Sequence, residues 1–241
     1  MKKHLLFAAL FMMTAWGCTS EQSPVYKDAS ADIEDRVEDL VGRMTLEEKI
    51  LQLNQYTLGV NTVENNLGEV VKDIPAEIGS LIYFSDAPTG RNAMQRKAME
   101  ESRLGIPILF GHDVIHGYRT TYPIPLAQAC SWNPELARQA CEVAAQEASD
   151  CGIDWTFSPM VDVARDPRWG RVAEGYGEDT YLASCMGAAA VRGYQGKDSV
   201  VRMAACVKHF AGYAASEGGR DYNSTWIPEI QLRETYLPPF K

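Results

Sequence analysis

The sequence predicts an α/β fold in which parallel strands alternate with helices. Short apolar runs rich in β-branched and aromatic residues recur along the chain, and longer stretches with helical spacing of apolar side chains separate them. In addition, each polar motif follows an apolar run and precedes a helical stretch. Alternating strands and helices form βαβ units, so the polar motifs are expected to meet at the carboxyl ends of a parallel sheet.

The elements follow one another in a regular order after a polar N-terminal stretch. Apolar residues at helical spacing from Ile33 predict a first helix, and Thr45 with Glu48 forms a capping box for a second. Asn133 and Pro134 mark a later helix start as N-cap and first-turn proline. The expected strands are 78–84, 106–110, 153–157 and 201–207, with 60–71 as a further candidate, and the expected helices are 91–103, 134–150, 180–194 and 228–236.

A closed (β/α)8 barrel is favoured over an open doubly wound sheet, although both bind ligands at the carboxyl ends of strands. No glycine-rich phosphate fingerprint follows the first strand. A whole barrel needs eight strands and typically about 250 residues, whereas this chain of 241 residues offers four strands, or five with residues 60–71. We therefore expect a partial (β/α)8 TIM-type barrel, its N-terminal half to two-thirds only.

The N-terminus resembles an export signal. Lys2 and Lys3 precede an apolar run over residues 5–13, a pattern typical of a secretory signal peptide, here residues 1–17. The run is too short to span a bilayer, which takes about 20 residues. Cys18 then follows a sequence similar to a bacterial lipoprotein processing site, with an ordinary cleaved signal as the alternative.

The expected domain organisation follows from this signal. Residues 18–31 form a lipidated cysteine and a flexible polar tether, and residues 32–241 form the incomplete barrel domain. The protein is expected to be exported, to the periplasm or to the outer membrane as a lipoprotein, and to contact the membrane only through the lipid anchor. The sequence leaves the oligomeric state open.

Composition excludes some partners. The chain has 32 acidic and 23 basic side chains, a net charge of -9, and no tract rich in Lys and Arg. The electrostatic footprint of a nucleic-acid-binding protein is therefore missing, and no nucleic-acid partner is expected.

Neither a disulfide framework nor a metal site is expected. The cysteines other than Cys18 are odd in number and lack CxxC or zinc spacing. Most are expected to act as small hydrophobic residues, with Cys141 and Cys151 as the one pair worth testing for a disulfide. The spacing of His112, Asp113 and His116 lacks the HExxH pattern of a zinc site, so no cofactor is expected.

Three polar loops follow three of the expected strands. They are GHDVIHG (residues 111–117), VDVARDPRWGRVAEGYGED (161–179) and KHFAGYAASEGGRDYN (208–223). The last begins with Lys208, a cation with three donors, and His209, whose ring donates or accepts. Such groups suit a neutral ligand covered in hydroxyls, which indicates a sugar.

Taken together, GHDVIHG, DPRWGR, GEDTY and KHFAGY in this order resemble glycoside hydrolase family three, in particular its periplasmic bacterial β-glucosidases. The resemblance runs from about residue 33 to the last residue. It implies a retaining, exo-acting β-glycosidase that removes terminal β-D-glucosyl residues from the non-reducing ends of oligosaccharides. The alternatives are a β-xylosidase or the β-N-acetylglucosaminidase branch of the same family, and a truncated, non-catalytic sugar-binding envelope lipoprotein.

The resemblance also implies that this chain holds no catalytic residue. Retaining glycosidases need two carboxyl groups, a nucleophile and an acid/base. In the family, the nucleophile is an Asp on a later barrel strand and the acid/base is usually a Glu in a second domain, and neither is found before Lys241. We therefore expect the 241 residues alone to bind sugar weakly and to hydrolyse nothing.

The resemblance implies a substrate-binding role for Asp113, Arg171, Lys208 and His209. A carboxylate at Asp113 accepts hydrogen bonds from sugar hydroxyls through two oxygens, and the other three side chains donate to the remaining hydroxyls. Tyr213 and Glu217 are candidates for the pocket rim, with loop scaffolding as the alternative.

Other polar residues of the motifs are expected to be structural. Arg168 is expected to brace its loop by pairing with Asp162 or Asp166. Glu174, Glu178 and Asp179 are not expected to be catalytic, and Asp179 is expected to be a helix N-cap. His112 and His116 are expected to be mostly structural, and Arg220 and Asp221 to lie at the rim or to support the loop.

Overall fold

The computed structural model describes residues 23–59, 71–84, 88–196 and 202–241. The chain separates into two compact units, Met1–Thr45 and Leu46–Lys241, which are described in turn. The predicted signal peptide (1–17) and Cys18 lie outside the described residues, as does the strand candidate at 60–71 except for its last residue.

The described part of the first unit is a short helical segment. It contains a 3-10 turn, Val25–Lys27, and helix α1, Ile33–Arg43, as predicted. The Asp32 side chain caps α1 by accepting from the backbone N–H of Glu34 at 2.9 Å. None of the residues of α1 is buried.

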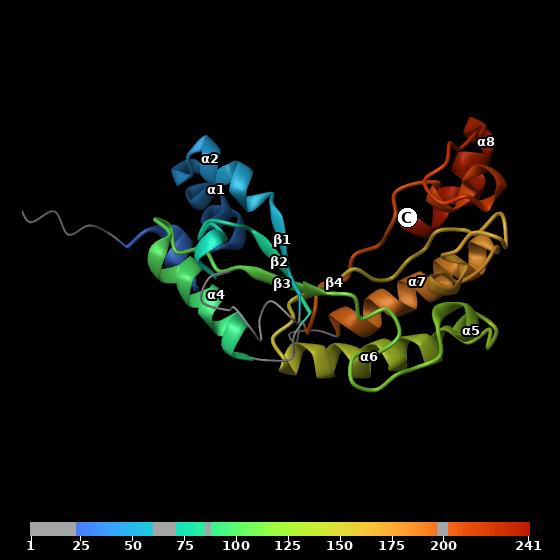
Figure 1. The fold of residues 1–241 in the computed structure, drawn as a ribbon, viewed down its shortest axis with the longest axis horizontal. Helices are drawn as coiled ribbons and strands as arrows, with labels where there is room; N and C mark the ends of the chain where they lie inside the picture. The colour runs from blue at the N-terminus through green and yellow to red at the C-terminus, as the bar shows by residue number, and fades with distance from the viewer. Residues whose placement is uncertain (1–22, 60–70, 85–87, 197–201) are drawn as a thin grey trace, which may run out of the picture. The chain divides into compact units, whose positions relative to one another are not determined.

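The second unit is built on a four-stranded parallel sheet with the order β1-β2-β3-β4 (Figure 1). The strands are β1 (Gln55–Leu58), β2 (Ser80–Tyr83), β3 (Leu109–His112) and β4 (Trp155–Thr156). Three of them confirm predicted strands. Strand β1 was not predicted, because three of its four residues are exposed and it contains no apolar run.

Residue 201 of the predicted strand 201–207 lies outside the described residues, and the rest of that segment forms isolated bridges beside β4. Ala204 bridges Trp155, and Lys208 bridges Met160, both in parallel orientation. The N–H of Ala204 donates to Asp154 O at 2.8 Å, so this segment extends the parallel hydrogen bonding past β4. The prediction of a continuous strand was wrong because the register slips: from Ala204 to Lys208 there are four residue steps, and they face five steps from Trp155 to Met160.

Helices connect the strands in the order that a (β/α) unit requires. After α2 (Leu46–Gln52) come α4 (Pro88–Glu101), α6 (Pro134–Asp150) and α7 (Thr180–Gln195), all of which confirm predicted helices. The short α5 (Pro125–Ala129) was not predicted. The predicted helix 228–236 consists of α8 (Glu229–Gln231), one turn long, and a π-helical turn, Leu232–Tyr236, and a 3-10 turn at Pro238–Phe240 follows.

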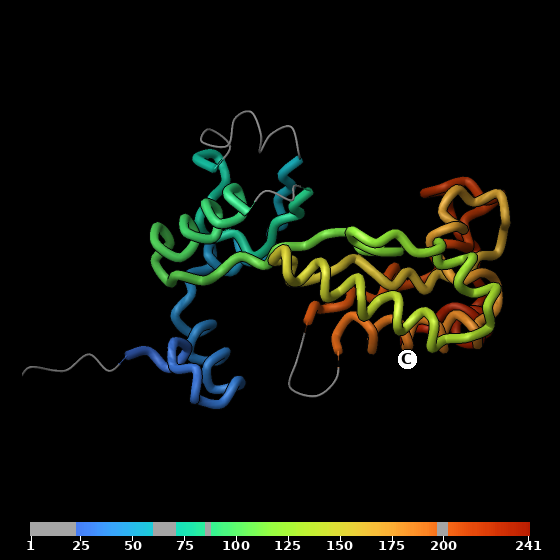
Figure 2. Tube along the Cα trace, turned by 90° about the horizontal axis from the view of Figure 1, so that it is seen from below, coloured from blue at the N-terminus to red at the C-terminus, as the bar shows by residue number. Residues whose placement is uncertain are grey.

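Local signals set the starts of the two long helices. The Asn133 side chain accepts from Glu135 N at 3.1 Å, and the Asp179 side chain accepts from Leu182 N at 2.6 Å. Both N-caps were predicted. The two helices, α6 and α7, run side by side in two views (Figures 1 and 2). Gly193 permits this close approach, since a Cβ there would lie 2.4 Å from Arg138 O.

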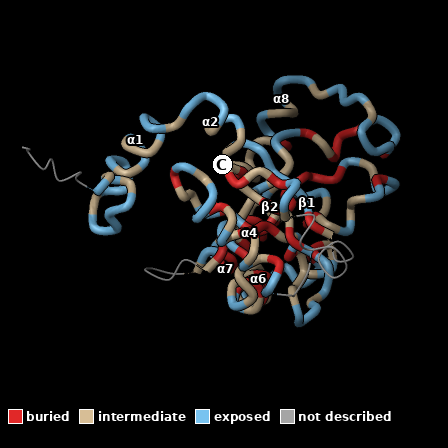
Figure 3. The backbone as a smooth tube through the Cα atoms, turned by 60° about the vertical axis from the view of Figure 1, so that its left-hand side comes forward, coloured by how far each residue is buried: buried red, intermediate tan, exposed pale blue. Residues whose placement is uncertain are grey.

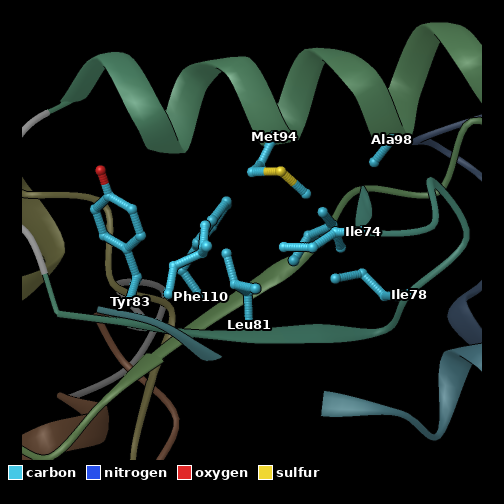
Figure 4. Close-up of a cluster of buried hydrophobic side chains, with 9 residues drawn as sticks. Ile74, Ile78, Leu81, Tyr83, Met94, Ala98 and Phe110 are labelled. Carbon is cyan, nitrogen blue, oxygen red and sulfur yellow. The ribbon is translucent and has the colours of Figure 1, made fainter. Parts of the chain in front are cut away.

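Buried side chains fill the space between the sheet and α4. Met94 and Ala98 of α4 point toward Leu81 of β2 and Ile74 (Figure 4). The Phe110 ring of β3 packs edge-on against Tyr83 at 6.0 Å between centroids. Buried residues, drawn in red, are concentrated in the strands and in the packed helices of this unit (Figure 3). This apolar core supports the strands that carry the polar loops.

The described cysteines are all free thiols, so Cys141 and Cys151 form no disulfide. Cys141 is buried between α6 and α7, where burial raises the pKa of its thiol to about 11. Cys151 instead lies beside Arg119, whose Nη2 donates to its sulfur at 3.2 Å. Cys130 is exposed, unlike the buried hydrophobic residue that was expected for most of the cysteines.

Two kinds of feature, membrane-spanning helices and metal-binding clusters, are absent from the described residues. None of the helices there combines the length and the apolar character needed to cross a bilayer. In the same ranges, His, Cys, Asp and Glu side chains form no group of three or more that could hold a metal ion.

Candidate functional site

The carboxyl ends of the parallel strands bring the predicted ligands together. Asp113 directly follows β3, and Lys208 ends the bridged segment beside β4. Lys208 Nζ lies 3.3 Å from Asp113 Oδ1, although 95 residues separate them in sequence. Asp113 remains half-exposed, so this carboxylate has further acceptor positions open to a ligand.

The backbone around Asp113 is held by buried hydrogen bonds. The N–H of Val114 donates to Thr156 Oγ1 at 3.1 Å, and the Tyr194 hydroxyl donates to Val114 O at 2.7 Å. Before the loop, Gly111 is required because a Cβ there would lie 2.5 Å from the indole Nε1 of Trp155. In the GHD motif, Gly111 therefore allows close packing against Trp155, whereas Asp113 is placed to meet a ligand.

Arg171 is clamped by Glu174. Its Nε and Nη2 donate to Glu174 Oε1 and Oε2, both at 2.7 Å. Arg171 lowers the pKa of the Glu174 carboxyl, and the charges of Lys208 and His209 lower it further, whereas burial opposes them. The pair leaves Nη1 as the guanidinium nitrogen that Glu174 does not engage.

A pocket of about 400 Å³ contains three of the four predicted ligands. Its lining includes residues of all three polar loops, the first residue of α5 and the residue before it. A larger pocket of about 750 Å³ runs along α7 and contains none of the predicted site residues. The smaller pocket is lined by Asp113, Ile115, His116, Ile124, Pro125, Arg171, Ala173, Glu174 and Lys208.

His209 lines a neighbouring pocket, also of about 400 Å³, which shares Arg171 with the first. The carboxylate of Asp162 holds His209 at two points: Oδ2 lies 3.0 Å from the backbone N and 2.8 Å from the ring Nδ1. The Asp162 side chain is almost fully buried, at 1% exposure, and that of His209 is 33% exposed.

Tyr213, predicted at the pocket rim, lies in an aromatic cluster that lines the second pocket. Its ring packs edge-on against Trp169 at 5.2 Å and His209 at 4.9 Å, and the Arg171 guanidinium lies 5.5 Å from its centroid. Burial, together with the nearby Asp221 carboxylate, raises the pKa of Tyr213 to about 12, so its hydroxyl is neutral at ordinary pH.

The other predicted rim residue, Glu217, is exposed and lines neither of the two pockets. Asp221, for which rim and scaffold were both open, accepts from Trp169 Nε1 at 2.9 Å. This bond links the loop after His209 to the loop that carries Arg171. Asp221 therefore supports the loop.

Residues expected to brace the loops do so. Arg168 makes a two-point ion pair with Asp166, with nitrogen–oxygen distances of 2.9 and 2.6 Å, and this pairing lowers the pKa of Asp166 to about 2. His112 Nδ1 lies 2.9 Å from Tyr83 O. His116 Nδ1 lies 3.1 Å from Tyr122 O, while His116 also lines the first pocket.

Sequence reasoning missed the pairing of Asp162 with His209 and that of Glu174 with Arg171. Asp162 was considered only as a partner of Arg168. A signal was present, because Asp162 stands between Val161 and Val163, and a carboxylate inside a buried apolar run needs a strong partner.

A family model described as "Glycosyl hydrolase family 3 N terminal domain" matches residues 45–241. The chain belongs to this family. The match confirms the resemblance carried by the loop motifs, and it includes every predicted ligand.

Family 3 relatives match this chain over most of its length. A periplasmic β-glucosidase of Salmonella typhimurium is 44% identical over 207 residues, which make up 85% of this chain and 27% of that protein. A β-xylosidase of Formosa agariphila is 32% identical over 251 residues, covering 98% of this chain and 28% of that protein. The chain therefore spans less than a third of the length of these relatives.

A solved family 3 structure confirms the predicted fold. The β-glucosidase from Listeria innocua in complex with glucose matches with a TM-score of 0.78 at 40% identity, over 86% of this chain and 31% of that one. The likeness supports an α/β domain that represents the N-terminal part of a (β/α) barrel.

Proposed function

We propose that the protein carrying this chain is a retaining, exo-acting β-glycosidase that hydrolyses terminal, non-reducing β-D-glucosyl residues of oligosaccharides. The observation that carries the proposal is the pocket in which Asp113, Arg171 and Lys208 converge. Membership in family 3 supports the reaction class. The Listeria innocua relatives in complex with glucose and with laminaribiose support a β-glucoside as the substrate.

In this proposal the 241 residues hold the sugar, and the reacting carboxyl groups come from elsewhere in the protein. In the described residues, Asp113 is paired with Lys208, Glu174 with Arg171, and Asp162 with His209. These pairings give the three carboxylates a role in holding neighbouring side chains in place, and the proposal assigns the acid/base and the nucleophile to other residues.

The paired charges suit a neutral ligand. A sugar hydroxyl donates to the Asp113 carboxylate, while the Lys208 ammonium and Nη1 of Arg171, which Glu174 does not engage, donate to sugar oxygens. Hydrogen bonds to charged groups contribute about 1.5–3 kcal/mol each. Because each anion keeps its cation, binding a neutral sugar leaves no charge unpaired.

The proposal is tested with the intact gene product, by comparing hydrolysis of nitrophenyl β-glucoside and nitrophenyl β-xyloside. We expect kcat/KM to be higher for the glucoside, and Asp113→Ala to lower it about 100-fold or more, because the carboxylate accepts from two hydroxyls. Equal hydrolysis by wild type and Asp113→Ala would contradict the binding role of Asp113.

The same assay separates the alternatives. Preference for the xyloside would favour a β-xylosidase, an activity named for the Formosa agariphila relative. Glucose binding by the intact product without hydrolysis of either substrate would favour a non-catalytic sugar-binding protein.

We further propose that the protein is exported and anchored by a lipid on Cys18. The N-terminal pattern of residues 1–17 supports export, and the Salmonella typhimurium relative is named as periplasmic. Cell fractionation tests the anchor: Cys18→Ser should move the protein from the membrane fraction to the soluble periplasmic fraction. An unchanged distribution would leave a cleaved signal without lipid as the better description.

A further inference from the structure

We propose that Asp162 is a positioning residue that holds His209 with its proton on Nδ1 and so reserves Nε2 for the sugar. The inference rests on the proposed function, in which His209 is a sugar ligand. It adds a residue that does not line either pocket and acts through another side chain.

The geometry of the pair restrains the histidine in two ways. Asp162 Oδ2 accepts from the backbone N–H of His209 at 3.0 Å, which locates the main chain, and lies 2.8 Å from Nδ1, which sets the ring rotation. A carboxylate accepts and does not donate, so Nδ1 must carry the hydrogen. Nε2 is then the ring nitrogen left to meet a ligand in the pocket that His209 lines.

Neighbouring contacts make this arrangement rigid. The N–H of Val161 donates to Lys208 O at 2.8 Å, so the residue before Asp162 is bonded to the residue before His209. The Tyr213 ring packs edge-on against the imidazole at 4.9 Å. Two segments 47 residues apart in sequence are thus locked together at the point where the carboxylate meets the ring.

Burial indicates that the charge of Asp162 serves this contact. The side chain is 1% exposed and is flanked by the buried residues Val161 and Val163. A buried carboxylate is costly, and apolar residues of similar volume are often as stable or more stable in its place. Oδ2 receives both hydrogen bonds, whereas Oδ1 has no partner among the described residues, so the group is directed at His209 and not at the surrounding core.

The first test measures the ring nitrogens directly and needs no sugar. In the full chain labelled with 15N-histidine, the His209 signals should show the hydrogen on Nδ1 in the wild type. Asp162→Ala should lose this preference. Asp162→Asn preserves volume and one acceptor oxygen, so as the conservative variant it should largely keep the hydrogen on Nδ1. Asp166→Asn is the matched control, since Asp166 lies in the same loop but pairs with Arg168.

The second test uses hydrolysis of nitrophenyl β-glucoside by the intact gene product. Asp162→Ala should raise KM about tenfold with a smaller change in kcat, and its effect should largely disappear in a His209→Ala background, because the two residues act as one unit. Asp166→Asn should leave both constants near wild type.

The two tests distinguish failure of the positioning role of Asp162 from failure of the proposed sugar contact of His209. A wild-type His209 with its hydrogen on Nε2, or an Asp162→Ala variant with unchanged ring signals, overturns the positioning role. If the ring signals change as expected but His209→Ala binds and hydrolyses the glucoside normally, the proposed sugar contact of His209 is wrong and the structural pairing stands. Additive effects of Asp162→Ala and His209→Ala on KM also overturn the inference.

Discussion

Two regions of this molecule, an apolar core and a polar pocket, share the same strands but are held together by different interactions. Beneath α4, Phe110 of β3 lies in an apolar core, and three residues later Asp113 of the same segment faces a polar pocket. The core is held by non-directional burial, which tolerates changes that conserve volume. The pocket is held by ion pairs with defined donor and acceptor atoms. Changes in the core should therefore alter stability, and changes in the pocket should alter binding.

The largest effect on stability is expected in the core. Phe110→Ala removes a ring that is 1% exposed and should lower the free energy of unfolding by about 3–5 kcal/mol. Chemical denaturation measures this loss. Leu109→Ala is the matched control, since the neighbouring side chain is 54% exposed and should change stability by about 0.5 kcal/mol or less. Equal losses in the two variants would break the distinction between core and surface in β3.

In the pocket, Arg171→Lys should weaken glucose binding about tenfold with little loss of stability. Lysine keeps the positive charge but lacks the planar fork that meets both oxygens of Glu174. Calorimetric titration with glucose measures the effect. Arg168→Lys is the control, because that arginine also forms a two-point pair in the same loop but lies outside both pockets. A similar loss in both variants would point to loop disorder as the cause.

The Arg171–Glu174 pair should also make stability depend on pH. In the folded protein the pKa of Glu174 lies below the ordinary 4.5 of a glutamate, because Arg171 stabilises the carboxylate. The pair therefore stabilises the fold fully above pH 4.5. This contribution is lost as pH falls through the lowered pKa of the folded state. The effect should be modest because the carboxylate is 33% exposed. Glu174→Gln should be less stable than wild type at pH 7, and the difference should shrink as pH falls below 4.5.

Denaturation of both proteins across this range checks the sign. Glu178→Gln, an exposed position in the same loop, is the control and should track wild type. A stability difference between wild type and Glu174→Gln that grows as pH falls would contradict the assignment.

The smallest effect is expected at a helix end. Asp179→Ala removes the side chain that accepts from Leu182 N at 2.6 Å and should cost about 1 kcal/mol of unfolding free energy. Glu178→Ala, one residue earlier and exposed, should change it by about 0.5 kcal/mol or less. If the two variants are equal within error in thermal denaturation, the cap contributes nothing to the stability of α7.

Sequence alone determined the features that depend on near neighbours. The N-caps Asn133 and Asp179 were predictable because a capping side chain bonds to backbone only two or three residues away. Strands β2 and β3 were predictable because each lies within an apolar run that contains buried residues. The placement of Asp113 and Lys208 at one edge followed from the parallel order of those strands.

Only the tertiary structure decided the features that depend on distant partners. Strand β1 lacks an apolar run, and its pairing with β2 defines it. The role of Asp162 appears only when His209, 47 residues later, is brought against it. In the same way, Arg171 and Tyr213 meet because separate loops fold onto one edge of the sheet. A sequence pattern records the burial and the local bonds of a residue, but the partner of a buried charge is chosen by the packing of the whole domain.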